Sequence, residues 1–312
     1  MTSKRFFYLS LSLSAIILLS FALFNYCRND YGLFGYKAKP LKIYGQQERL
    51  PKYLFSYRYI PENFEGIIVG PSLTDNLNPE LIKDYKIYNA SIYGGNATEL
   101  RLLVENALRQ QDSEVKFLIL CLDPYFTKDS GKKTSHIDPR EYRGSLGSVD
   151  TIRLYYNQFM VKAGFTPDYF NSYGCFDFTL EKPNKDARPY IKDAAQKASS
   201  KQKIEINPEA FEDIRSIVDL AHKNKLKVYA FYFPRPQELY LLRKDHYLDY
   251  QAKMNTIFSA GDVVWDFNSE EYLNFSNDYR NYSDEAHLSK QGATALLREI
   301  EKKLGVSKGP SP

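Results

Sequence analysis

The chain has 312 residues, of which 43% are hydrophobic and 15% aromatic, and it contains three cysteines. This composition is too apolar for a disordered chain and too poor in cysteine for a small disulfide-rich protein. The formal net charge is +4, but Lys4, Arg5 and Arg28 flank an uncharged N-terminal stretch, and no Asp or Glu precedes Asp30. Taking these three cations from +4 leaves a nearly neutral body at +1, which does not favour nucleic-acid binding.

The first predicted element is a helix that spans a membrane. Residues 6–27 carry no charge, and roughly 20 apolar residues cross a bilayer core as a helix. A cleaved signal peptide is the competing interpretation, but the residues before Cys27 are large where a cleavage site needs small ones. Lys4 and Arg5 outweigh Arg28, which places the N-terminus in the cytoplasm and the body in the periplasm or at the cell surface. We expect an uncleaved, single-pass signal anchor.

The remaining chain follows an alternating pattern of strands and helices. We divide it into an anchor at 1–28, a juxtamembrane connector at 29–65, an α/β domain at 66–304 and a tail at 305–312. Short apolar runs predict five strands, at 66–70, 86–90, 116–122, 226–233 and 262–267. Helical periodicity and capping residues predict helices over 97–110, 208–223 and 289–304. This alternation predicts βαβ units and a largely parallel sheet.

Residues 124–206 interrupt the alternation with scattered Gly and Pro and many aromatic residues. One interpretation is an insertion that packs on the sheet edge. The other is a lid or substrate wall, since long loops often cover the active sites of α/β proteins.

Two short segments carry residues that fit acyl-transfer chemistry. Ser72, in Gly70-Pro-Ser-Leu-Thr-Asp75, follows a predicted buried strand, where open α/β sheets place their ligands, although a Ser there is often only a helix cap. Asp284 and His287 are three residues apart before a predicted helix. This spacing lets the carboxylate hold Nδ1 of the imidazole and leaves Nε2 free as a base. Alternatively, Asp284 caps a turn and His287 lies on the surface.

Together these segments resemble the SGNH/GDSL hydrolase superfamily. The Ser72 segment is similar to its Gly-Asp-Ser-Leu signature, the run 89–96 to its glycine block, and Asp284-x-x-His287 to its last block. The resemblance implies a flavodoxin-like three-layer sandwich with a mainly parallel five-stranded sheet. It also implies that Ser72 is the nucleophile, His287 the base and Asp284 the group that orients it.

The resemblance further implies an oxyanion hole made by backbone N–H groups. These are the N–H of Ser72 and that of Gly94, with Gly95 as the alternative register. The superfamily places an Asn side-chain donor at the end of the third strand, where this chain has Asp123 or Leu122. A carboxylate beside an oxyanion is repulsive unless it is protonated or turned away, so a direct role of Asp123 is doubtful.

The N-terminal anchor and Asp123 narrow the resemblance to membrane-tethered SGNH-like proteins of bacterial cell envelopes, some of which act beside membrane-bound O-acyltransferases. This implies a serine acyltransferase or esterase that moves an acyl group, such as acetyl, between an acyl donor and a cell-envelope polysaccharide. The alternative is a non-catalytic glycan-binding or scaffold subunit that partners a membrane-bound O-acyltransferase. The sequence contains no zinc-ligand spacing, phosphate loop or dinucleotide fingerprint, so we expect no metal and no cofactor.

Overall fold

A parallel five-stranded sheet forms the centre of the protein. The computed structural model describes residues 3–34, 40–110, 113–128, 137–138, 140–181, 186–198 and 203–306. The strands are β1 (Gly66–Val69), β2 (Ile87–Asn89), β3 (Phe117–Leu122), β4 (Lys227–Tyr232) and β5 (Val263–Asp266), in the order β2-β1-β3-β4-β5. Every neighbouring pair is parallel. This is the flavodoxin-like order, so the predicted strands and fold class are confirmed.

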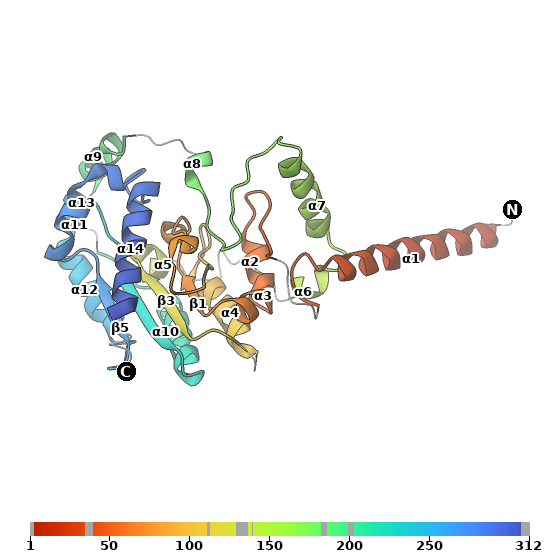
Figure 1. The fold of residues 1–312 in the computed structure, drawn as a ribbon, viewed down its shortest axis with the longest axis horizontal. Coiled ribbons are helices and arrows are strands. Elements are labelled where there is room, and N and C mark those ends of the chain that lie inside the picture. Colours follow the sequence, from red (N-terminus) through yellow and green to blue (C-terminus); the bar gives the residue numbers. More distant parts are fainter. Residues whose placement is uncertain are drawn as a thin grey trace.

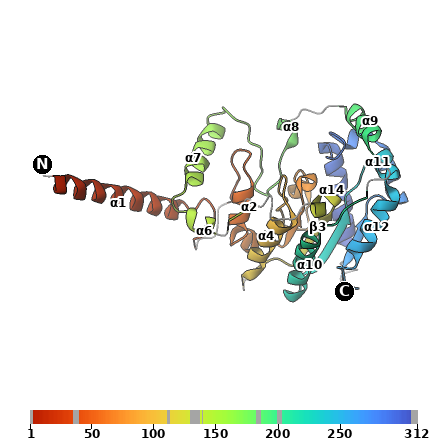
Figure 2. The ribbon, with the colours of Figure 1, turned by 180° about the vertical axis from the view of Figure 1, so that it is seen from behind.

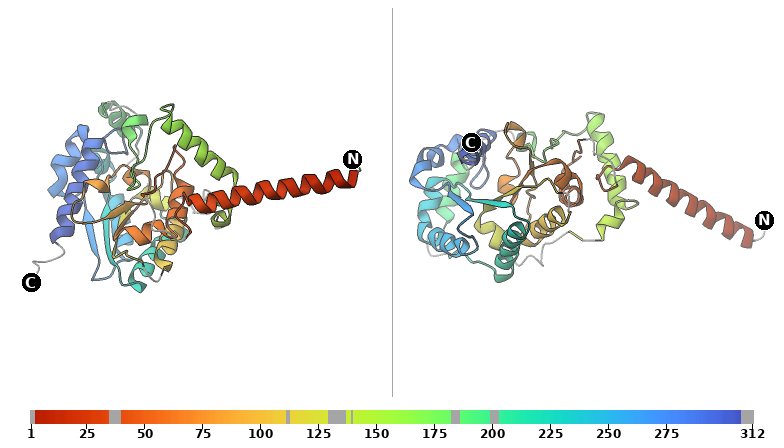
Figure 3. Two further views of the ribbon diagram at one scale, coloured as in Figure 1. Left: turned by 45° about the vertical axis from the view of Figure 1, so that its right-hand side comes forward. Right: turned by 60° about the horizontal axis from the view of Figure 1, so that its bottom comes forward.

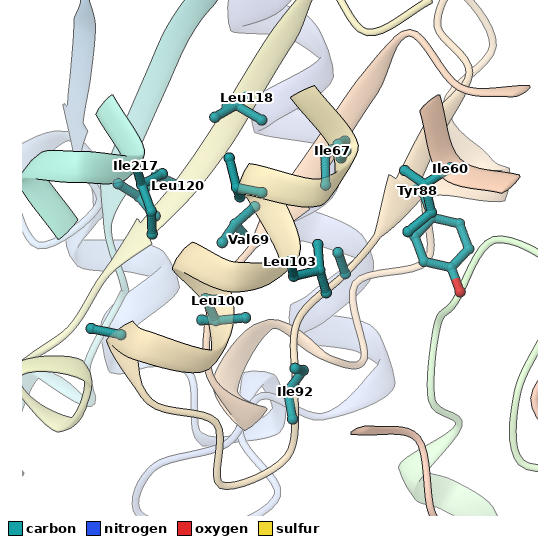
Figure 4. Close-up of a cluster of buried hydrophobic side chains, with 14 of the residues drawn as sticks. Ile60, Ile67, Val69, Tyr88, Ile92, Leu100, Leu103, Leu118, Leu120 and Ile217 are labelled. Carbon is teal, nitrogen blue, oxygen red and sulfur yellow. The ribbon is translucent and has the colours of Figure 1, made fainter. Parts of the chain in front are cut away.

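Side chains of each strand alternate between the two faces of the sheet, and each face has its own core. Ile67 and Val69 of β1 point to the face covered by α4 (Ala97–Arg109) and α10 (Pro208–Lys223). Figure 4 shows this cluster, with residues of β1 and β3 packed against α4 and α10. Such alternation is what a period of two residues produces when helices cover both faces of a sheet.

The opposite face is covered by α14 (Lys290–Val306), as Figures 1 and 2 show from the two sides. Ile68 of β1 and Cys121 of β3 pack there against Leu297 and Ile300 of α14. The three predicted helices are therefore found as α4, α10 and α14. Among the cysteines, Cys121 and Cys175 are buried and free, and Cys27 is exposed and free.

The predicted connector contains two helices that belong to the main core. These are α2 (Arg49–Phe55) and α3 (Tyr59–Asn63). Leu54 and Ile60 are fully buried in the cluster that also holds Ile67 and Val69. Residues upstream of the first strand thus contribute directly to the structure around the sheet.

The remaining helices belong to the insertion or to the segment between β4 and α14. The described part of the insertion contains α5 (Pro124–Lys128), α6 (Glu141–Gly144), α7 (Val149–Lys162), α8 (Phe178–Glu181) and α9 (Arg188–Lys197). Three further helices lie between β4 and α14, namely α11 (Gln237–Leu242), α12 (Lys244–Asn255) and α13 (Leu273–Asn277).

Helix α1 (Ser3–Arg28) extends away from the domain (Figure 1). Its 26 residues have a mean hydropathy of 2.2 in their most apolar window, and no residue of that window is buried. It is the one helix of the described chain whose length and composition suit a membrane span, a property that signal sequences share.

Candidate active site

Ser72 lies immediately beyond the carboxyl end of β1. It opens a short 3-10 turn, Ser72–Thr74, so its own N–H is not used within that turn. Gly70 precedes the turn at a point of close approach, where an added Cβ would lie 2.4 Å from Oγ1 of Thr74 and 2.8 Å from Cβ of Cys121. The glycine therefore lets the chain turn tightly at the end of β1, next to β3. The strand order reverses between β1 and β3, and open α/β sheets bind their ligands at such a point.

The loop that carries Ser72 is held by Asn89, the fully buried last residue of β2. Its amide nitrogen donates to the carbonyls of Thr74 at 2.7 Å and of Leu77 at 2.8 Å. Its side-chain oxygen accepts from the N–H of Ser91 at 3.0 Å. One amide side chain thus fixes the Ser72 loop to the beginning of the loop at residues 90–96, which contains Gly94 and Gly95 and is called the glycine loop below.

His287 lies in a turn just before α14. The N–H of Ser283 donates to the carbonyl of His287 at 2.9 Å, which closes this turn. Asn76, four residues after Ser72, donates from its side chain to the carbonyl of Leu288 at 2.8 Å. Because Leu288 adjoins His287, this bond joins the two loops that carry the serine and the histidine.

The structure brings Ser72, His287 and Asp284 into one hydrogen-bonded series. Oγ of Ser72 lies 3.1 Å from Nε2 of His287, and Nδ1 of His287 lies 3.0 Å from each carboxylate oxygen of Asp284. This is the spacing required for a hydroxyl, a base and an orienting carboxylate. With Asp284 accepting from Nδ1–H, Nε2 is left to take the proton of Ser72.

Asp284 is held in its charged form. Burial alone would raise its pKa, but the hydrogen bond and charge of His287, together with the N–H groups of His287 and Ala286, lower the pKa to about 2. The two N–H groups donate to Oδ1 at 2.7 and 2.9 Å. The carboxylate is therefore ionised at any pH near neutrality.

The glycine loop distinguishes between the two predicted oxyanion donors. The N–H of Gly95 donates to the carbonyl of Ile92 at 2.9 Å and is therefore engaged. The N–H of Gly94 makes no hydrogen bond with the part of the chain that the structure describes. Gly94 has φ +61°, which favours glycine, and Pro71 and Ile92 form a parallel bridge that places this loop beside Ser72. The geometry favours Gly94 over Gly95.

The carboxylate of Asp123 is already engaged with other groups of the protein. Its side chain is buried, one oxygen accepts from the N–H of Tyr125 at 2.9 Å, and the other pairs with the guanidinium of Arg235. Both oxygens are thus already used as acceptors. Arg235, which follows β4, neutralises the carboxylate and was not predicted from sequence.

A second set of charged residues lies buried beneath the two loops. Lys52 of α2 is fully buried, and its Nζ lies 2.6 Å from Oδ1 of Asp75, 2.5 Å from Oε2 of Glu48 and 2.5 Å from the carbonyl of Ser91. Glu48 also accepts from the N–H of Tyr93. Burial and the charge of Glu48 hold the pKa of Asp75 well above its ordinary value, even though Lys52 acts in the opposite direction.

The insertion forms an aromatic wall beside His287. Phe178 contacts the imidazole edge-on at 5.6 Å between ring centroids, Phe176 contacts Phe178 at 4.9 Å, and Tyr169 stacks on Phe176 at 5.5 Å. The three rings line a cavity of about 460 Å³, whose lining includes neither Ser72 nor His287 and which adjoins the imidazole through Phe178. It also contains the side chains of Asn76, Asn78, Asn171 and Lys290.

A larger cavity, of about 750 Å³, is not part of this site. Its lining includes Glu65, Lys86 and Lys116, which precede β1, β2 and β3. It therefore lies at the amino ends of the strands, whereas Ser72 lies at their carboxyl ends. No group of three or more His, Cys, Asp or Glu that could hold a metal occurs within the described residues.

No protein-family model matches the chain, and no curated protein matches it. Among the solved structures that do match, a candidate platelet activating factor from Streptococcus pneumonia is 10% identical, with a TM-score of 0.45 and coverage of 83% of this chain and 92% of that one. A GDSL-like lipase from Bacteroides thetaiotaomicron is 12% identical, with a TM-score of 0.42 and coverage of 83% and 97%. A candidate acylhydrolase from Bacteroides fragilis is 13% identical, with a TM-score of 0.37 and coverage of 78% and 86%.

Replacing Asp284 should change how stability depends on pH. The folded pKa of about 2 lies below the ordinary value of 3.8, so the ionised carboxylate stabilises the fold above about pH 4, and this contribution is lost as the pH falls toward 2. In Asp284→Asn this part of the acid-side slope should be missing when free energies of unfolding are measured between pH 2 and 5. Asp219→Asn, on the exposed side of α10, is the control and should keep the wild-type slope. Equal slopes in wild type and Asp284→Asn would contradict a lowered pKa of Asp284 in the folded protein.

Replacing Lys52 should destabilise the protein strongly. Lys52→Met leaves Glu48 and Asp75 buried without their cation, which typically costs about 3–5 kcal/mol of the free energy of unfolding. Lys42→Met is the matched control, because Lys42 pairs with Asp168 in a partly exposed salt bridge at 2.5 Å and should change stability by less than about 1 kcal/mol. Denaturant unfolding curves measure both changes. Similar losses in the two variants would show that the buried cluster has no special importance.

Proposed function

We propose that the protein is a membrane-anchored, extracytoplasmic serine acyltransferase or esterase that transfers or removes an acyl group, such as acetyl, on a cell-envelope polysaccharide. The observation that carries this proposal is the hydrogen-bonded series Ser72–His287–Asp284 at the carboxyl edge of the sheet. A buried hydroxyl placed 3.1 Å from an imidazole that a carboxylate orients is an activated nucleophile.

In the proposed mechanism, Oγ of Ser72 attacks the acyl carbonyl carbon while its proton moves to Nε2 of His287. The N–H groups of Ser72 and Gly94 hold the resulting oxyanion, and one such donor typically contributes about 3–4 kcal/mol to transition-state stabilisation. Collapse of the intermediate expels the donor alcohol, which takes the proton from His287 and leaves an acyl-Ser72. A second hydroxyl then gives its proton to His287 as it attacks the acyl carbon. Collapse of this second intermediate breaks the bond to Ser72, whose Oγ takes the proton back from His287. If this hydroxyl belongs to a sugar the reaction is transfer, and if it belongs to water the reaction is hydrolysis.

The cavity lined by Phe178, the ring that contacts His287, supports a carbohydrate as the acyl-bearing or acyl-accepting molecule. Its wall of Tyr169, Phe176 and Phe178 is aromatic, and polar side chains such as Asn78 and Lys290 border it. Aromatic faces bordered by a few polar groups suit a ligand with both apolar ring surfaces and hydroxyls.

The membrane anchor in this proposal is α1. Its exposed apolar surface and 26-residue length suit a span, and Lys4 and Arg5 at its start favour a cytoplasmic N-terminus. The catalytic domain then lies outside the cytoplasm, where cell-envelope polysaccharides occur. A membrane-bound O-acyltransferase that supplies the acyl group is the proposed partner.

A serine-reactive fluorophosphonate should label the wild-type protein, because Ser72 is activated by His287. Labelling should disappear in Ser72→Ala, and kcat for an ester substrate should fall by about 10⁶-fold in both Ser72→Ala and His287→Ala. Ser172→Ala, in the insertion, is the control and should be labelled like wild type. Absence of labelling in folded wild-type protein would overturn the catalytic proposal and support the non-catalytic glycan-binding or scaffold alternative.

Tyr169→Leu should raise KM for a carbohydrate ester without changing the turnover of a small ester that has no sugar. The variant keeps an apolar contact with Phe176 but removes the ring face that borders the cavity. We expect KM for an O-acetylated oligosaccharide to rise about two- to tenfold, as the loss of an aromatic contact predicts, with unchanged turnover of para-nitrophenyl acetate. Tyr190→Leu, on α9, is the control. An unchanged KM in Tyr169→Leu would exclude this wall as a sugar-binding surface.

A further inference from the structure

Helix α7 presents an apolar face to solvent. Val149, Ile152, Tyr156 and Phe159 are exposed by 65, 57, 60 and 61% of their surface. At 100° per residue they lie within an arc of about 80° on the helix. Phe165, just after the helix, is 68% exposed and contacts Phe159, so it extends the same apolar surface. Contiguous exposed apolar patches of this kind usually bind a protein or a membrane.

Packing of α7 on the rest of the protein does not use this face. The buried residues of the helix are Thr151, Leu154 and Gln158, which fall on the opposite side of the helix. The domain therefore contacts α7 through one side of the helix. The apolar face on the other side is left available to a partner outside the domain.

The attachment of α7 connects it to the end of α1. The amide of Asn25 donates to the carbonyl of Leu146 at 2.8 Å and accepts from the hydroxyl of Tyr155, while Arg28 donates to Gln158 at 3.0 Å. The guanidinium of Arg28 also lies 5.1 Å from the ring centroid of Tyr155. These contacts hold α7 against the last turns of the proposed membrane span.

The orientation of α7 suits a membrane surface. It lies on the side of the domain from which α1 leaves, and it runs across the direction of α1 rather than along it (Figure 3). If α1 crosses a bilayer, a helix placed in this way lies alongside the bilayer surface. Figure 1 shows α11 and α12 at the opposite end of the molecule.

The charges on α7 also fit this partner. Arg153 and Lys162 are exposed and lie on either side of the apolar arc. Asp150 partly offsets them, since it pairs with Arg153 at 3.0 Å. Apolar side chains between two cations are typical of a helix that lies in the headgroup region, where long basic side chains reach the phosphates.

We propose that the apolar face of α7 inserts into the lipid headgroup region of the leaflet that faces the domain, and so forms a second membrane contact beside α1. This inference rests on the proposed membrane anchor, because α1 brings α7 to the bilayer. The occupant is lipid with anionic headgroups. Together the two contacts fix both the distance and the orientation of the catalytic domain relative to the membrane.

Depth-dependent quenching of tryptophan fluorescence tests this proposal on the full chain, reconstituted in vesicles of phosphatidylcholine and phosphatidylglycerol. Tyr156→Trp should lose fluorescence when a nitroxide lies near the carbonyl end of the lipid acyl chains. Leu18→Trp, in α1, should be quenched by a nitroxide deep in the acyl chains. Leu241→Trp, on α11 and 54% exposed, is the control and should not be quenched. The native Trp265 is buried and gives a constant background.

The outcomes separate the second contact from the anchor. Quenching in Leu18→Trp with none in Tyr156→Trp would overturn the α7 contact and leave the anchor intact, whereas no quenching at either position would overturn both. Adding Ile152→Glu and Phe159→Glu to Tyr156→Trp should abolish its quenching, and retained quenching would also overturn the proposal. If Tyr156→Trp is shielded from the nitroxide at high protein concentration, and this shielding disappears when the protein is diluted in lipid, a second copy of the chain is the occupant instead.

Discussion

The buried ammonium group of Lys52 is the contact on which the geometry of the site depends. It joins three segments, because it pairs with Glu48 before α2 and with Asp75 after Ser72, and donates to the carbonyl of Ser91 in the glycine loop. Burying one cation with two carboxylates is costly in free energy, and the cost is offset only if the hydrogen bonds are well formed. The arrangement therefore tolerates little movement of the Ser72 loop relative to the glycine loop.

Two further hydrogen bonds hold the segments that carry Ser72 and His287 in place. Asn89 holds the carbonyls behind Ser72, and Asn76 holds the carbonyl of Leu288 beside His287. Because a hydroxyl and an imidazole must stay within hydrogen-bonding distance for proton transfer, such ties matter as much as the reacting groups. Asp123 and Arg235 add an ion pair at the same edge. With both its oxygens accepting, Asp123 supports the loops rather than adding an oxyanion donor.

The sequence predicted the parts of this arrangement that have a local pattern. Apolar runs and helical periodicity identified the five strands and α4, α10 and α14. Ser72, Asp284 and His287 lie in short motifs whose spacing carries the chemistry. Lys52 and Arg235 had no such signal. An i,i+4 pair such as Glu48 and Lys52 is usually exposed, and the burial of the two cations depends on Asp75 and Asp123, which lie far away in sequence. The choice between Gly94 and Gly95 needed the hydrogen bond from Gly95 to Ile92, which only the folded backbone defines.

The end of α1 is held against the domain by hydrogen bonds and buried residues. Asn25 and Arg28 form hydrogen bonds with residues of the insertion, and Tyr31 and Leu33 are buried directly after the helix. A helix that continues into buried contacts transmits its orientation to the domain, whereas an exposed polar linker would not. In the proposed arrangement the aromatic wall beside His287 therefore keeps a fixed position relative to the bilayer. An acyl donor delivered at the membrane and a polysaccharide approaching from outside would then meet Ser72 in a constant geometry.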